Sequence, residues 1–248
     1  MSNHITSVTL HPEKYPSDGH YPFSLPILNQ TRKILFEFPV TFFVGENGTG
    51  KSTLLEAIAL ASNIHIWRKC EGGRYQVNHY EKQLYKYISL ERSNGTVPGS
   101  YFGSEIFNDF RRILDSWAAS DPGQLKYFGG KSLITQSHGQ SIMAYFRSCY
   151  SRRGIYFLDE PETALSPKSQ LALMDILREN GKAGHAQFII ATHSPILLAY
   201  EDAKIYSFDA SPVSAIEYQE TEIDVPGVFF QRICCPLDLN PFKRAIGI

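Results

Sequence analysis

The feature that most constrains this chain is a glycine-rich segment between a short apolar run and an amphipathic one. Residues 40–44 (VTFFV) are typical of a buried strand, and residues 45–53 read GENGTGKST. The first eight residues of this segment match the pattern G-x-x-x-x-G-K-[ST] without a mismatch. Apolar residues then recur with a helical period, at Leu54, Ile58 and Ala61. A strand, a glycine-rich loop and a helix in this order predict a phosphate-binding loop (P-loop) in an α/β protein.

The residue types of this loop suit the phosphates of a nucleotide. Glycines let the backbone approach closely, so that successive N–H groups point at phosphate oxygens, and the helix N-terminus adds partial positive charge. In this pattern the lysine, Lys51, reaches the β- and γ-phosphates, and the serine, Ser52, ligates Mg²⁺. The predicted nucleotide-binding residues are therefore Gly45, Glu46, Asn47, Gly48, Thr49, Gly50, Lys51, Ser52 and Thr53.

A strand–helix–strand unit follows later in the chain. Residues 154–161 (GIYFLDEP) form an apolar run that ends in two acids, and residues 187–195 (QFIIATHSP) form a second one. Between them lies a predicted helix, which Ser166 caps, Pro167 opens and Gly181 ends. Strands joined by a crossover helix predict parallel pairing in a doubly wound sheet, in which ligands bind beyond the carboxyl ends of the strands.

The polar residues that end these two strands are the predicted catalytic groups. A P-loop needs a second carboxylate site for the metal and a base for the attacking water. We assign Asp159 to Mg²⁺ and Glu160 to the water, because neighbouring residues of a strand point to opposite faces. His193 ends the next strand, from where it can contact the γ-phosphate. With Lys51, Glu160 and His193 form the predicted catalytic set.

Composition narrows the class further. The 248 residues are interpreted as one domain (1–248) with a mostly helical subdomain over residues 105–150, and strands over 5–10 and 34–38 predict an antiparallel part. The net charge of −1 provides no global attraction to nucleic acid or anionic membranes. No apolar stretch approaches the roughly 18 residues of a membrane span, and no leader pattern opens the sequence. We expect a cytoplasmic protein without membrane insertion, whose cysteines (Cys70, Cys149, Cys234 and Cys235) are free thiols.

These segments, in this order, resemble the ABC-type ATPase superfamily over roughly residues 35–200. The P-loop and the run IYFLDEP match its two nucleotide motifs, Ser137-His138-Gly139-Gln140 is similar to its signature, Ala164-Leu165-Ser166 to its D-loop, and His193 to its switch histidine. The wordings QSHGQ, DEPETALSP and ATHSPILLA look most like the soluble, AAA-annotated branch with the overcoming-lysogenization-defect nucleases and Rad50-like and RecF-like proteins. The resemblance implies a P-loop NTPase fold with ATP and Mg²⁺ as cofactors.

The resemblance also implies an ATP-bound homodimer, in which the signature of one subunit completes the site of the other. Residues 136–141 (QSHGQS) precede a predicted helix whose apolar face contains Ile142, Phe146 and Cys149. A helix N-terminus with a serine hydroxyl and a glycine suits a γ-phosphate. Ser137, Gly139 and Gln140 are accordingly predicted to contact the ATP of a neighbouring subunit.

Two features of the family pattern are not found. No glutamine occupies the expected Q-loop, for which Glu105 is the best candidate by position. The aromatic residue that stacks on adenine is not identified either, although Tyr15, His20 and Tyr21 are candidates. The sequence also gives no role to His138.

The leading interpretation is an ATP-hydrolysing switch that acts on a partner, such as a separately encoded effector. The alternatives are the energising subunit of a membrane transporter, an ATPase that acts on DNA, and a P-loop kinase, for which Glu160 and the signature would have no purpose. Residues 204–248 are interpreted as a hairpin and a short helix that could dock a partner.

Overall fold

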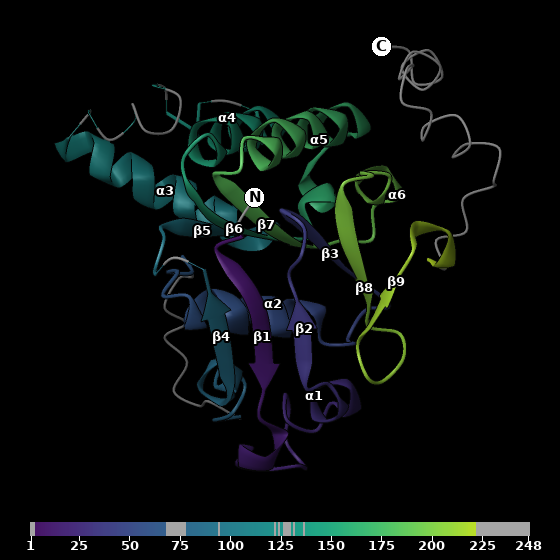
Figure 1. Cartoon of the computed structure of the whole chain (residues 1–248). Helices are drawn as coiled ribbons and strands as arrows, with labels where there is room; N and C mark the ends of the chain where they lie inside the picture. Colours follow the sequence, from purple (N-terminus) through teal and green to yellow (C-terminus); the bar gives the residue numbers. More distant parts are fainter. Residues whose placement is uncertain are drawn as a thin grey trace.

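The apolar runs recognised in the sequence lie side by side in one six-stranded sheet (Figure 1). The computed structural model describes residues 3–67, 78–93, 95–121, 123, 125, 130, 132–135 and 137–221. The strands follow the order β5 (Gly99–Gly103), β6 (Gly154–Asp159), β7 (Ala186–Ala191), β3 (Val40–Val44), β8 (Ala203–Ser207) and β9 (Ser214–Ile216). All neighbouring pairs are parallel except β8 with β9. The predicted mostly parallel sheet and the predicted β6–β7 pairing are confirmed.

Both faces of this sheet are buried, as continuous apolar strands require. One face packs against the helices α4 (His138–Tyr150) and α5 (Pro167–Lys182), and the other against α2 (Lys51–Ala61). In β3, Phe42 belongs to the hydrophobic cluster that includes α4 and α5, and Phe43 belongs to the cluster that includes α2. The sheet therefore separates two apolar layers and holds the carboxyl ends of β3, β6 and β7 at one edge.

A second, antiparallel sheet covers the far side of α2 (Figure 1). It has the order β2 (Lys33–Leu35), β1 (Ile5–Leu10), β4 (Ile88–Arg92), and it confirms the predicted antiparallel part. The strand predicted over residues 34–38 is shorter than expected. Its end is explained by Asn3, whose side-chain amide donates to the carbonyls of Phe36 and Phe38 where a strand partner would donate.

Two buried side chains join the two sheets: the Tyr206 hydroxyl of β8 hydrogen-bonds to the backbone of Leu35 in β2, and Gln187 of β7 pairs with β1. Gln187, in the centre of the main sheet and 1% exposed, accepts the backbone N–H of Ile5 at 2.9 Å and donates to the carbonyl of Ile5 at 2.9 Å. Its amide thus pairs with β1 as the backbone of a neighbouring strand would. The antiparallel sheet is fixed to β7 through this contact.

The helices follow the predictions with one exception. The region predicted to be mostly helical contains α3 (Ser104–Ser120) and α4. Ser166 caps α5 by accepting the N–H of Ser169 at 3.3 Å, and Pro167 is its first residue. The prediction that Gly181 ends α5 is wrong, because this glycine lies inside the helix, where it packs against Pro39 and Val40. The left-handed residue after the helix is Gly184, at φ +72°.

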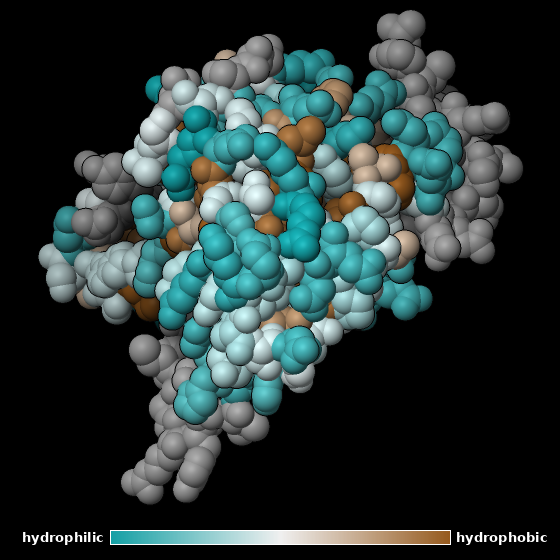
Figure 2. All heavy atoms as spheres, turned by 60° about the horizontal axis from the view of Figure 1, so that its bottom comes forward, coloured by the Kyte–Doolittle hydropathy of each residue, from teal (hydrophilic) through white to brown (hydrophobic). Residues whose placement is uncertain are grey.

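The remaining elements are short. They are α1 (Pro26–Gln30), α6 (Pro195–Leu198) and the 3₁₀ segments η1 (Pro12–Lys14), η2 (Leu84–Tyr87), η4 (Pro161–Ala164) and η5 (Tyr218–Glu220). The hairpin predicted near residues 204–220 is confirmed by β8 and β9, whereas the short helix predicted after it lies outside the described residues. In the described part of the chain no helix is long and apolar enough to cross a membrane. Figure 2 shows a face on which small hydrophobic areas are separated by hydrophilic residues.

Candidate functional site

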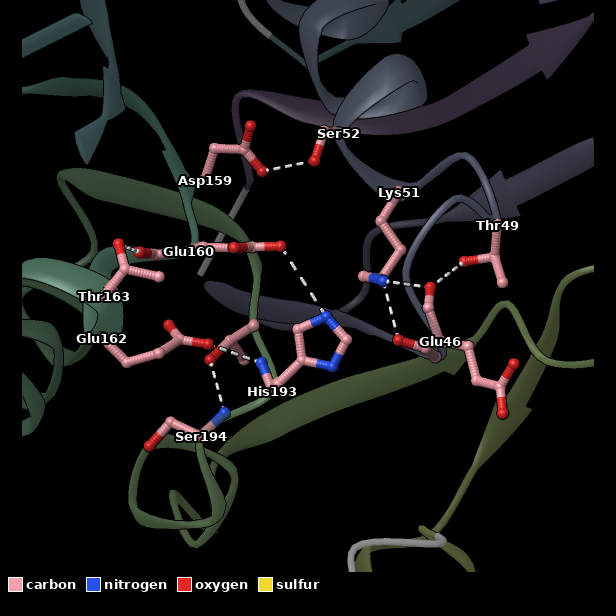
Figure 3. A network of polar contacts seen from close by, with 12 residues as sticks. Glu46, Thr49, Lys51, Ser52, Asp159, Glu160, Glu162, Thr163, His193 and Ser194 are labelled. Atoms are coloured by element: carbon pink, nitrogen blue, oxygen red, sulfur yellow. Dashed lines mark hydrogen bonds and ion pairs between the residues drawn. The ribbon is translucent and has the colours of Figure 1, made fainter. Parts of the chain in front are cut away.

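The P-loop connects β3 to α2 at the carboxyl edge of the main sheet (Figure 3). Its glycines Gly45, Gly48 and Gly50 have φ values of +137°, +83° and +102°, which other residues rarely adopt. Because α2 begins at Lys51, its first N–H groups have no partner within the helix and open into the loop. This end of α2 therefore presents backbone donors to a negatively charged ligand.

Lys51 lies in the middle of this loop. Its ammonium group donates to the carbonyls of Gly45 at 2.7 Å and Glu46 at 2.6 Å. Burial lowers the pKa of Lys51, while the carboxylates of Glu160, Asp209, Asp159 and Glu162 act in the opposite direction. The ammonium group of Lys51 thus lies near several carboxylates, and a bound phosphate would bring further negative charge close to it.

Ser52 and Asp159 form the predicted metal pair. The Ser52 hydroxyl donates to Asp159 Oδ1 at 2.7 Å, and the Tyr101 hydroxyl donates to Asp159 Oδ2 at 2.9 Å. Burial raises the pKa of Asp159, and both hydrogen bonds oppose that rise. Hydroxyl and carboxylate oxygens are the hard ligands that Mg²⁺ prefers, so the donor set fits this ion. No cluster of three or more His, Cys, Asp or Glu within the described ranges could hold a metal, so Mg²⁺ would depend on this pair and on phosphate oxygens.

Glu160 and His193 face each other across the same edge. Figure 3 shows the carboxylate and the imidazole ring directed toward one another, with His193 Nε2 3.7 Å from Glu160 Oε1. The two acids do point in different directions, but the predicted reason, the alternation of side chains along a strand, is wrong. β6 ends at Asp159, and Glu160 adopts a left-handed conformation (φ 44°, ψ 55°) where the chain turns into η4. That turn directs the two acids differently.

The signature-like segment forms the first turn of α4. Ser137 accepts the N–H of Gln140 at 3.4 Å, and the Gln140 side chain accepts the N–H of Ser137 at 3.3 Å, which makes a capping box. Apart from its chain neighbours and the backbone of its own helix turn, Gly139 has no described atom within 4 Å of the position of a β-carbon. Gln136 lies outside the described residues. No hydrogen bond recorded for the described residues links positions 137–140 to the P-loop of the same chain.

His138 has a structural role that the sequence did not indicate. Its Nδ1 lies 3.1 Å from Arg111 Nη1 on α3, and its ring meets Phe107 edge to face. Burial lowers the pKa of His138, and the neighbouring Arg111 lowers it further. A neutral imidazole accepts the arginine donor, so this residue joins α4 to α3.

The other candidates separate clearly. Glu105 is exposed in the first turn of α3, and it is Tyr101, four residues earlier, that contacts Asp159. Tyr15 packs against Phe23 and Tyr87. His20 lies near the Tyr80 ring. Tyr21, which is 41% exposed, reaches the P-loop, where its hydroxyl forms a hydrogen bond with Thr53.

A cavity of about 200 Å³ opens beside this contact. Tyr21, Thr53 and Leu60 line it, together with residues before β4 such as Tyr85. Sequence reasoning missed two further contacts of the site. The Asp209 carboxylate accepts the N–H of Glu46 at 2.7 Å, and Glu162 contacts the backbone of His193. No local pattern marks either residue.

Fold and site together define a P-loop nucleotide-binding protein. The sequence matches two family patterns in succession: "AAA domain" over residues 23–109 and "AAA domain, putative AbiEii toxin, Type IV TA system" over residues 105–199. It is 27% identical over 157 residues to the ferric enterobactin transport ATP-binding protein FepC of Escherichia coli (56% of each chain). It is also 27% identical over 168 residues to the manganese transport system ATP-binding protein MntA of Synechocystis (62% of this chain, 64% of MntA).

The chain thus spans about three fifths of the length of these curated relatives. A solved structure, cbiO1 from Clostridium perfringens, described as part of the ABC transporter complex cbiONQ, superposes with a TM-score of 0.50 at 18% identity, covering 99% of this chain and 100% of that one. This similarity supports the fold alone. Together these matches support an ABC-type P-loop ATPase as the class of this chain. The matches support ATP binding and hydrolysis, the activity of that class.

Proposed function

We propose that this protein binds ATP and hydrolyses it with Mg²⁺. One observation carries the proposal: Lys51, the pair Ser52–Asp159 and the pair Glu160–His193 meet at the carboxyl edge of three adjacent strands. These residues are the parts that phosphoryl transfer to water requires, namely a phosphate cradle, a metal pair and a group that orients water. A kinase would have no use for Glu160 at this position.

Each residue has a separate task in this proposal. The loop N–H groups and Lys51 bind the phosphates and neutralise charge that develops during transfer. Bound Mg²⁺, held by Ser52 and Asp159, would polarise the phosphate oxygens. Glu160, 37% exposed at the tip of its turn, accepts a proton from the attacking water. His193 beside it contacts the γ-phosphate, so that the residue responds to the presence of ATP.

The cavity beside Thr53 is the place for the nucleoside. The cavity adjoins the first turn of α2, next to the place proposed for the phosphates. Tyr21 and Tyr85 provide aromatic surface on its wall. Aromatic rings stack on bases through their faces. Of the three adenine-stacking candidates, Tyr21 alone is in contact with the P-loop in the described structure.

The signature-like segment is proposed to act on the ATP of a second copy. The segment forms the N-terminus of α4, Gly139 leaves open space for close approach, and no hydrogen bond among the described residues joins positions 137–140 to their own P-loop. Two copies that place Ser137, Gly139 and Gln140 against each other's nucleotide would form a homodimer that opens after hydrolysis. Such a cycle is a switch for a partner, for instance a separately encoded effector.

The names of the curated relatives favour one alternative, the ATP-binding subunit of a transporter. Co-purification with a membrane protein supports that alternative. Stimulation of turnover by DNA that is lost at high salt supports a DNA-processing ATPase. Neither result changes the assignment of the nucleotide site.

The test is Glu160→Gln, which keeps the shape of the side chain and removes the base. We expect hydrolysis to fall at least about 100-fold, the scale of a lost general base, while ATP still binds. In MgATP the variant should elute as a dimer on size-exclusion chromatography. Lys51→Ala is the matched control and should neither bind ATP in calorimetry nor dimerise. A Glu160→Gln protein that binds ATP and stays monomeric would contradict the homodimer, and unchanged ATP affinity in Lys51→Ala would contradict the P-loop assignment.

A further inference from the structure

Glu162 joins the two loops that carry Glu160 and His193. This residue lies in η4, directly after the turn of Glu160, and its Oε1 accepts the backbone N–H of His193 at 2.6 Å. Figure 3 shows the side chain reaching from η4 to the backbone of His193. Both loops start at the same level, because Asp159 of β6 is paired with Ala191 of β7. A single carboxylate therefore bridges the ends of neighbouring strands.

The backbone around His193 is also held from its other side. The N–H of Ser194 donates to Thr192 Oγ1 at 3.0 Å, and the Ser194 hydroxyl donates to Gln170 Oε1 at 2.6 Å. Gln170 in turn donates to the carbonyl of Leu165 at 3.1 Å. Thr192, Ser194 and Gln170 are buried, whereas the side chain of His193 is 40% exposed. The backbone of this loop is thus fixed, and its exposed part is the imidazole ring.

The contact of Glu162 with the His193 backbone is short, at 2.6 Å. Burial raises the pKa of Glu162, and the hydrogen bond from the N–H of His193 is the first of the effects that oppose the rise. Losing this hydrogen bond would release the His193 backbone on the side that faces Glu160.

We propose that Glu162 is a positioning residue, which sets the place from which the ring of His193 faces Glu160. The inference rests on the proposed hydrolysis by Glu160 and His193, whose side chains lie 3.7 Å apart. Glu162 acts through the backbone of His193 and has no assigned contact with the nucleotide. Apart from its charge near Lys51, which Glu162→Gln removes as well, its effect on kcat should disappear when the imidazole is absent.

The experiment compares Glu162→Ala, which removes the acceptor, with Glu162→Gln, which keeps an amide oxygen at the same place. We expect kcat to fall about 10–100-fold in the alanine variant, the scale of lost support to a site residue, and less in the glutamine variant. KM for ATP should change less than about threefold, because the P-loop is untouched. Glu179→Ala, an exposed glutamate on α5, is the matched control and should retain wild-type kcat.

Two readouts separate positioning from general destabilisation. In a His193→Ala background, Glu162→Ala should lower kcat less than about twofold further, since residues that act as a unit are not additive. Amide hydrogen exchange at His193, followed without nucleotide, should be at least about tenfold faster in Glu162→Ala than in the wild type. In Glu162→Gln, exchange at His193 should be slower than in Glu162→Ala.

Full kcat in Glu162→Ala, additive losses with His193→Ala, or unchanged exchange at His193 would each overturn the inference. If the alanine variant does not fold, the glutamine variant carries the test, with a kcat below the wild type and an unchanged KM as the required result. An inactive wild-type protein would instead refute the proposed hydrolysis. The exchange experiment would still report whether Glu162 holds the His193 backbone.

Discussion

Gln187 offers the most direct test of how the two sheets are held together. Gln187→Met keeps the length of the side chain and removes both hydrogen bonds to Ile5. The backbone N–H and carbonyl of Ile5, which is 2% exposed, would then lose their partners. A buried polar group left without a partner costs about 1–3 kcal/mol, so the two together cost about 2–6 kcal/mol.

Part of this cost is offset by the apolar side chain. Burying a methionine contributes about 1.5–3 kcal/mol, of which the glutamine methylenes already supply a share. The net loss in the free energy of unfolding should be about 2–4 kcal/mol. For a chain of this size, that lowers Tm by roughly 5–15 °C.

Urea unfolding followed by circular dichroism measures this free energy directly. Gln219→Met is the control, because Gln219 is exposed, and its free energy of unfolding should change by less than about 0.5 kcal/mol. A loss in Gln187→Met as small as that of the control would show that the antiparallel sheet is held by other contacts, such as apolar packing on α2 and the hydrogen bonds between Tyr206 and Leu35.

Two further predictions concern the site. Gly139→Asp has space in the monomer and places an acid in the first turn of α4, where the helix dipole favours negative charge, so Tm should not fall. Hydrolysis should drop at least about tenfold, while the ATP affinity of the monomer measured by calorimetry persists. Wild-type turnover in this variant would mean that the segment never contacts a phosphate. Asp159→Asn should be more stable than the wild type near neutral pH without nucleotide. Because burial raises the pKa of Asp159, the native state keeps its proton to higher pH than the unfolded chain does, and stability is lost as pH rises from the usual aspartate range through the raised native pKa. Thermal scans from acidic to neutral pH should show a gap between the two proteins that widens with pH, and a gap that narrows would contradict this assignment.

The parts of the fold that could be predicted have local signals. β3, β6, β7 and α5 are marked by apolar runs, a capping serine and an opening proline, and their positions agree with the structure. β5 (GSYFG) could not be recognised, because the glycines at both of its ends are typical of a loop. Gly99 lies so close to β6 that a β-carbon would sit 2.0 Å from the carbonyl oxygen of Ile155. The need for glycine at position 99 comes from a residue 56 positions later in the sequence, so a local sequence pattern could not reveal it.

The same distinction applies to the site. The P-loop is a continuous segment whose chemistry follows from its spacing. Tyr101, Glu162 and Asp209 form their contacts with partners 58, 31 and 163 residues away. Their roles depend on which strands become neighbours in the sheet, and no single segment of the sequence determines that order.

The contact between Asp209 and the P-loop has a consequence for the boundaries of this protein. The matched family segments end at residue 199, yet β8 begins at Ala203 and pairs with β3 from Val40 to Val44. A chain shortened to the matched segments would expose the hydrogen-bonding edge of β3 and invite pairing with other molecules. It would also release the N–H of Glu46 in the P-loop from the Asp209 carboxylate. The smallest unit that can form this site is therefore longer than the segments that the two family patterns match.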